Sequence, residues 1–74
     1  MMRDVSDKKS QLKRLCRQQK ASFDLVENDM IIHCTNLSQY NIVLGMAHRI
    51  GKFVIETSCD WRWEFRGDII IRFA

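Results

Sequence analysis

A row of cationic side chains is the feature of this sequence best suited to a chemical role. The row consists of Lys9, Lys13, Arg14, Arg17 and Lys20. Four of these residues recur at spacings of four, four and three, which aligns them along one side of an α-helix, with Arg14 beside them. Aligned cations are suited to phosphates, because each neutralised phosphate releases a counterion and adds affinity. Glutamines among the cations could hydrogen-bond base edges in a major groove.

The positive charge of the chain comes from this one segment. Residues 1–20 hold seven basic and two acidic side chains, a net charge of +5, whereas residues 21–74 hold five basic and seven acidic ones, a net charge of −2. We therefore expect a small non-enzymatic binding or regulatory module that contacts nucleic acid, DNA or RNA, through a basic N-terminal helix. The alternative is an inhibitor or adaptor that binds an acidic protein through the same helix or a sheet edge. The simplest alternative is that the row is a solvent-exposed helix face without a ligand.

Aromatic residues near the C-terminus allow a second mode of nucleic-acid contact. Trp61, Trp63 and Phe65 could stack on bases if they were exposed, although the apolar residues that follow favour burial of all three in the core. Arg62 and Arg72 would then form a secondary basic spot on the reverse face. A membrane surface is not an expected partner, because the basic helix lacks a bulky apolar face that would insert.

The candidate catalytic and metal-binding residues do not form a recognisable pattern. Those with suitable chemistry are Cys16, His33, Cys34, His48 and Cys59, and they show no compact zinc spacing. Asp24 can face His33 across a hairpin, but adjacent residues of a strand point to opposite faces, which separates His33 from Cys34. The glycines stand apart and do not form a phosphate-binding loop. We expect neither catalysis nor a bound metal or cofactor.

The cysteine content and the N-terminus indicate the compartment. Three cysteines at wide spacings cannot form a full disulfide framework, which favours a reducing environment. The N-terminal residues lack the apolar region of a secretory signal, and no apolar run approaches 18 residues. We therefore expect a cytoplasmic protein without a membrane-spanning segment.

The first half of the chain predicts a helix and a hairpin. The basic segment is rich in strong helix formers over about residues 6–20, with Ser6 or Asp7 as the N-cap. Residues of about 22–35 predict a β-hairpin with Asn28-Asp29 as its turn. In that register Leu25 faces Ile32, Phe23 faces Cys34 and Asp24 faces His33, and the apolar residues share one face.

A second helix is expected over about residues 37–50. Asn36 or Ser38 would cap it and Gly51 would end it. Leu37, Tyr40, Val43, Leu44, Met46, Ala47 and Ile50 would form its broad apolar face. Against full helicity, residues 42–44 are a β-leaning run and Gly45 weakens a helix.

The last third, about residues 52–73, predicts a three-strand meander. After a strand at 52–57, the alternating pattern of Trp61, Trp63 and Phe65 predicts a second strand. With a loop at 66–68, these residues would face Phe73, Ile71 and Ile69 respectively, and the pairs would form the main wall of the core. A two-residue Gly67-Asp68 loop is the alternative, but it mixes the faces.

Together these elements predict one α+β domain over residues 1–74. The expected order is α-β-β-α-β-β-β, with about five strands in an antiparallel or mixed sheet and two helices packed on it. An open sheet edge in a chain of 74 residues would also suit a homodimer.

Overall fold

The chain folds into two αββ units that share one sheet. The structure is a computed structural model that describes residues 2–73, with side chains described from residue 6. In chain order the elements are α1 (Met2–Gln19), β1 (Ser22–Val26), β2 (Asp29–Cys34), α2 (Leu37–Ile50), β3 (Val54–Asp60) and β4 (Arg66–Arg72). The predicted α+β class with two helices is confirmed. Within the described residues the sheet is antiparallel and has four strands, so the prediction of about five strands ending in a meander of three is wrong.

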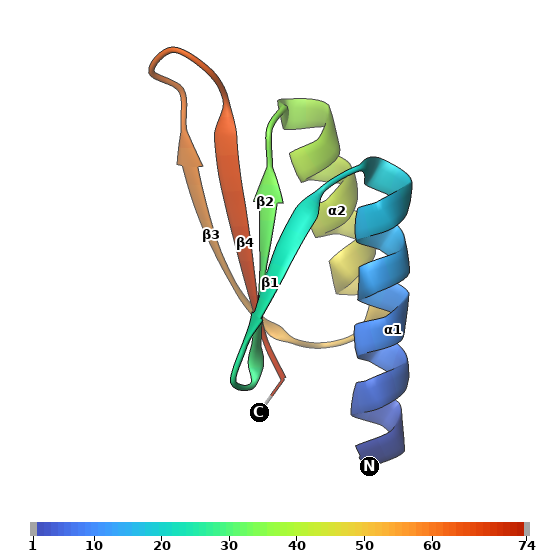
Figure 1. The fold of residues 1–74 in the computed structure, drawn as a ribbon. Coiled ribbons are helices and arrows are strands. Elements are labelled where there is room, and N and C mark those ends of the chain that lie inside the picture. The colour runs from blue at the N-terminus through green and yellow to red at the C-terminus, as the bar shows by residue number, and fades with distance from the viewer. Residues whose placement is uncertain (1, 74) are drawn as a thin grey trace.

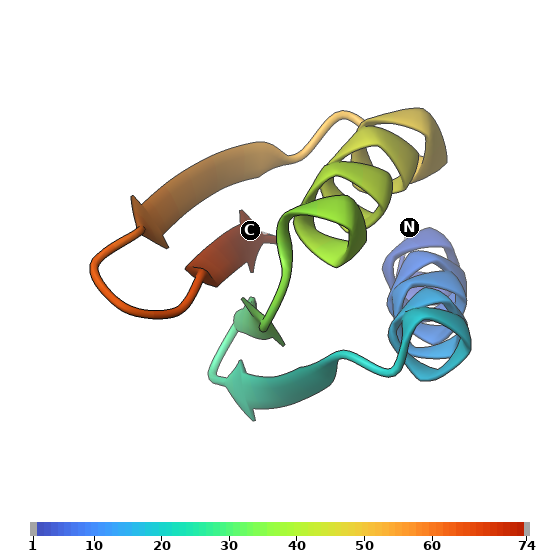
Figure 2. The same cartoon turned by 90° about the horizontal axis from the view of Figure 1, so that it is seen from above.

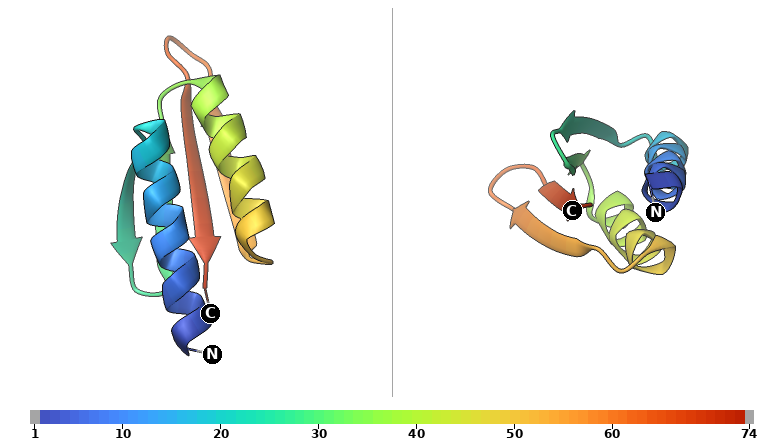
Figure 3. Two further views of the ribbon diagram at one scale, coloured as in Figure 1. Left: turned by 90° about the vertical axis from the view of Figure 1, so that its right-hand side faces the viewer. Right: turned by 90° about the horizontal axis from the view of Figure 1, so that it is seen from below.

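The strands lie in the order β1-β2-β4-β3. The last strand of each αββ unit is therefore central, and the first strand of each unit forms an edge. Both helices cover the same face of the sheet (Figures 1 and 2), with α1 over the β1–β2 side and α2 over the β4–β3 side (Figure 3). The other face of the sheet carries no helix, and we call it the open face.

The core lies between the helices and the two central strands. Strand alternation turns Met30, Ile32 and Cys34 of β2 and Ile69 and Ile71 of β4 toward the helices, and all five are buried. The helices contribute further buried residues, which are Leu12, Leu15, Cys16, Val43 and Ala47. The central strands consequently provide most of the apolar surface that both helices cover.

Helix α1 begins earlier than predicted. It starts at Met2, so Ser6 and Asp7 lie within the helix and do not cap it. At the other end Lys20 has a left-handed backbone, with φ of 58°. The Ala21 N–H donates to the Cys16 carbonyl at 2.8 Å and closes the last turn in the manner of a Schellman motif.

Helix α2 matches its predicted bounds and capping residues. The Asn36 side chain accepts a hydrogen bond from the Gln39 N–H at 2.7 Å, and the Gly51 N–H donates to the Ala47 carbonyl at 3.3 Å. The β-leaning run is helical because Val43 lies fully buried in the core. The apolar face is narrower than predicted, since Leu37 and Met46 are exposed.

The first hairpin exists but uses another turn. Val26 pairs with Asp29, so Glu27 and Asn28 form the turn, and Glu27 takes a left-handed backbone with φ of 55°. Phe23 pairs with Ile32, whereas the prediction paired it with Cys34. The two registers differ by two residues, which preserves the faces, and the observed one sets Leu25 opposite the buried Met30.

The predicted tryptophan strand does not form. Residues 61–65 connect β3 to β4 as a loop, and Trp61 and Trp63 are exposed by 61% and 96%. In place of the predicted partners, Ile69 and Ile71 pair with Thr57 and Ile55 on one side and with β2 on the other. The core prediction is wrong for Trp61 and Trp63, whereas Phe65, Ile69 and Ile71 are buried as predicted. The tryptophans are not needed beside the isoleucines because β2 supplies a second apolar surface.

Candidate nucleic-acid interface

The basic row lies along α1, and its members differ in exposure. Arg14, Arg17 and Lys20 are exposed, whereas Lys9 and Lys13 are half-buried. The helix buries Leu12 and Cys16 against the sheet and α2, so cations beside that stripe are partly covered by their neighbours. We call the five cations, Lys9, Lys13, Arg14, Arg17 and Lys20, the basic face of α1.

Lys9 is partly engaged within the protein. Its Nζ atom lies 5.1 Å from the centroid of the Phe73 ring, and Lys8 Nζ lies 5.8 Å from the centroid of Phe53. The two rings contact each other edge to face, with centroids 5.3 Å apart. These cation–π contacts hold the first half of α1 beside the entry to β3 and the end of β4. Lys13, Arg14, Arg17 and Lys20 make no such cation–π contact within the described side chains.

No salt bridge within the described side chains involves a cation of the basic face. The three ion pairs present join His33 to Asp24, His33 to Asp68, and Arg72 to Glu56. All of these residues alternate with the buried ones and therefore lie on the open face. Further carboxylates on that face are Asp29 and Asp60. The acidic groups are thus concentrated on the side of the sheet opposite α1.

His33 joins three strands on the open face. Its Nδ1 atom lies 3.0 Å from Oδ1 of Asp68 on β4, and its Nε2 atom lies 3.0 Å from Oδ2 of Asp24 on β1. Only the imidazolium can donate to both carboxylates at once. The hydrogen bond to Asp24, followed by that to Asp68, raises the pKa of His33 above its usual 6.5. The predicted proximity of Asp24 and His33 is therefore present, across a diagonal of the ladder, and it connects the edge strand β1 to the sheet.

The structure does not bring Arg62 and Arg72 together. Arg62 lies in the β3–β4 loop, whereas Arg72 ends β4 and binds Glu56 Oε1 through Nη2 at 3.1 Å. The expectation of a shared secondary basic spot depended on the tryptophan strand, which is absent. Arg66, at the start of β4, lies nearer to Arg62 than Arg72 does, and both line one hollow.

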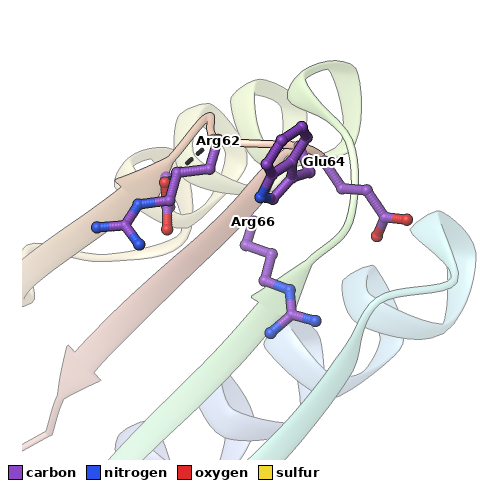
Figure 4. Close-up of a pocket in the computed structure, with 5 residues that line it drawn as sticks. Arg62, Glu64 and Arg66 are labelled. Carbon is purple, nitrogen blue, oxygen red and sulfur yellow. Dashed lines mark hydrogen bonds between the residues drawn. The ribbon is translucent and has the colours of Figure 1, made fainter.

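The β3–β4 loop carries Trp61 and Trp63, which the sequence-based prediction placed in the core, on the surface. A hollow of about 350 Å³ lies beside it, lined by Asp60, Arg62, Trp63, Glu64 and Arg66. Arg62 and Glu64 extend to different sides of the loop, and Arg66 extends away from it along the sheet (Figure 4). The alternating pattern could not reveal this, because the same spacing of aromatic residues is compatible with a strand and with this loop.

Cys16 and Cys34 are buried, which suppresses the nucleophilicity of both thiols. Burial, followed by the electrostatic effect of the neighbouring Cys34, raises the pKa of Cys16 to about 11. Burial and then the Asp68 carboxylate raise the pKa of Cys34 to about 11 as well. Both thiols are therefore protonated at neutral pH, whereas a nucleophilic cysteine must be a thiolate. Within residues 6–73, no group of three or more His, Cys, Asp or Glu side chains is arranged so that it could hold a metal ion.

In the described part of the chain, neither helix has the length and apolar character needed to cross a membrane.

Comparison with known proteins returns no relative. No protein-family model, curated protein or solved structure matches the chain.

Proposed function

We propose that this protein is a non-enzymatic binding module that contacts nucleic acid through the basic face of α1. The observation that carries the proposal is the separation of charge between the two sides of the sheet. Cations without a carboxylate partner in the described side chains lie along α1, and acidic groups lie on the open face. A phosphate backbone would be attracted to the first surface and repelled by the second, which orients the protein as it approaches.

Four cations supply most of this attraction. Lys13, Arg14, Arg17 and Lys20 keep their full charge for phosphates because no ion pair in residues 6–73 neutralises them. Lys9 adds to the local potential while its Nζ lies over Phe73. Each phosphate that a cation neutralises releases counterions, so affinity should depend steeply on salt concentration.

The first experiment is a titration of the protein with fluorescently labelled duplex and single-stranded nucleic acid at several salt concentrations. Four phosphate contacts predict a slope of about −3.6 in a plot of log K against log salt for duplex, at about −0.9 for each contact. Anisotropy of the labelled strand measures the affinity. Absence of binding even at low salt would contradict the proposal.

A charge-matched pair of variants locates the binding surface. The double variant Lys13→Glu, Arg17→Glu should reduce the magnitude of the salt slope by about two and abolish most of the affinity. The control, Arg49→Glu with Lys52→Glu, makes the same change in net charge at exposed positions outside α1. Equal losses in the two double variants would show that net charge, not the basic face, governs binding.

A second candidate is an inhibitor or adaptor that binds an acidic protein partner. It is supported by the apolar residues exposed on the edge strands, namely Leu25 at 48% and Val26 at 51% on β1 and Val54 at 60% on β3. The unpaired edges of β1 and β3 could also join a second copy of the chain or a partner's strand. An interface at a sheet edge would depend on a few apolar anchors and would respond to salt less steeply than phosphate contacts do.

A further inference from the structure

Trp63 is almost entirely exposed, which is unusual for the largest apolar side chain. Its exposed fraction is 96%, and that of Trp61 in the same loop is 61%. Tryptophan is highly buried on average, and exposed apolar surface that is not scattered singly marks binding sites. The exposure of two tryptophans in one five-residue loop therefore indicates a binding surface.

The loop is held at both ends while Trp63 points outward. Trp61 packs edge to face on Phe65 with centroids 4.9 Å apart, and Phe65 packs in the same way on Tyr40 of α2 at 5.5 Å. The Arg62 N–H also donates to Oδ1 of Asp60 at 3.2 Å. These contacts anchor the residues on either side of Trp63 and leave its indole ring unsupported by the protein.

The groups around Trp63 match the surface of an unpaired nucleobase. The hollow of about 350 Å³ beside Trp63 is lined by two arginines, Arg62 and Arg66, and by two acidic residues, Asp60 and Glu64. A base offers a flat π-face for stacking and an edge with both donors and acceptors, and it is joined to a phosphate. The indole ring can stack on the face of the base, the carboxylates and guanidinium groups can hydrogen-bond its edge, and an arginine can bind its phosphate.

We propose that the β3–β4 loop binds an unpaired base of a single-stranded nucleic acid, with Trp63 as the stacking platform. This inference depends on the proposed function and adds to it a selection for single strands. A duplex keeps its base faces stacked on one another, so it cannot offer one to Trp63. A bilayer would accept the indole ring but would meet the charges of Arg62 and Glu64 on both sides of it.

The loop and the C-terminal end of α1 lie at the same end of the molecule (Figure 1). Arg66 lines a second hollow of about 320 Å³ together with Thr35 at the end of β2. The Gln39 side chain accepts from the Thr35 N–H at 2.8 Å and donates to the Gln19 carbonyl at 2.6 Å. Gln39 thereby ties the segment after β2 to the last turn of α1 at this end of the molecule. A single strand long enough to span this end could contact both the loop and the basic face.

Removal of the stacking ring tests the inference. Trp63→Ala should weaken binding to a single-stranded homopolymer by about 5- to 150-fold, the range for loss of one base–aromatic stack, and leave duplex affinity and the salt slope unchanged. Trp63→Phe, which retains a ring, should restore part of the loss. Leu25→Ala removes an exposed apolar side chain on β1 and serves as the control. Circular dichroism confirms that each variant is folded.

Fluorescence supplies an independent readout of stacking. In a Trp61→Phe background Trp63 is the sole tryptophan of the chain, and stacking of a base on it should quench its emission. Unchanged single-strand affinity in Trp63→Ala, or an equal loss for duplex and single strand, overturns the inference.

The basic-face variants keep the two proposals distinguishable. If Lys13→Glu with Arg17→Glu abolishes binding while Trp63→Ala has no effect, the proposed function stands and the stacking site is wrong. If the wild-type protein binds neither form of nucleic acid, both proposals are wrong.

Discussion

His33 shows how one side chain can connect distant parts of this sheet. Because β1 is an edge strand of five residues, its hydrogen bonds to β2 are its only ladder within the sheet. The His33–Asp24 contact adds a side-chain link between β1 and β2, and the His33–Asp68 contact extends it to β4. The groups facing the imidazole from neighbouring strands are these two carboxylates, and Arg66 borders the same hollow.

The link should make stability depend on pH. The pKa of His33 is raised in the folded state, first by the hydrogen bond to Asp24 and then by that to Asp68. The stabilisation is therefore fully present below the unfolded pKa of about 6.5 and is lost as pH rises through the higher folded pKa. Urea unfolding between about pH 5.5 and 9 should show that the wild-type protein has a larger free energy of unfolding than His33→Gln. This difference should shrink as pH rises.

His48→Gln is the matched control for this series. His48 is exposed on α2 and makes no salt bridge within residues 6–73, so its variant removes an imidazole without breaking an ion pair and controls for the substitution itself. A constant difference between wild type and His33→Gln across the series would show that protonation of His33 does not stabilise the fold.

At the level of elements, helices were easier to predict than strand pairing. The bounds of α2 follow from Asn36 and Gly51, whose capping roles involve atoms only three or four residues away. The loop at 61–65 could not be predicted, because its conformation depends on whether Ile69 and Ile71 pair with β3 or with the tryptophans.

Two glycines illustrate how the same residue type serves different elements. Gly45 and Gly67 should respond oppositely to alanine. A Cβ at Gly45 meets nothing within 4 Å, so Gly45→Ala should raise the free energy of unfolding by about 0.5–1 kcal/mol through better helix propensity. A Cβ at Gly67 would overlap ring atoms of Tyr40 and Phe65, the latter at 2.8 Å, so Gly67→Ala should cost about 1–3 kcal/mol. Urea denaturation measures both. A neutral Gly67→Ala would mean that Tyr40 does not pack on β4 there.

On the scale of the whole molecule, both αββ units share one core on one face of the sheet. Ile31 and Ile32 are adjacent on β2, and only Ile32 is fully buried under the helices. The two faces therefore differ in what they contribute. The helix-covered face provides stability. The open face carries acidic groups on the side of the sheet away from the basic face of α1.

This asymmetry predicts unequal costs for the same substitution at neighbouring positions. Ile32→Ala should lower the free energy of unfolding by about 2–5 kcal/mol, a large part of the total for a chain of this size. Ile31→Ala, on the open face, should cost clearly less because its side chain is only half-buried. Equal costs in urea titrations followed by circular dichroism would contradict the assignment of the core.

The sequence by itself determined the features that depend on near neighbours along the chain. These are the α+β class, the helix over 37–50 with its caps, the alternation of β2 and β4, and the concentration of positive charge in α1. Each follows from interactions within a few residues or from composition alone. They also locate the basic face, because helical spacing aligns its members wherever the helix packs.

Only the tertiary structure decided which apolar surfaces meet. Trp63 and Ile32 were both suitable apolar neighbours for the core-facing isoleucines of β4. The local sequence pattern does not show which of the two lies beside them. The β2–β4 pairing buries Ile69 and Ile71 completely, and the short loop then leaves Trp63 outside. The bridge from His33 to two other strands arises from the same pairing. Competition for a limited buried surface is a property of the whole fold, and it created the exposed ring that we assign to base stacking.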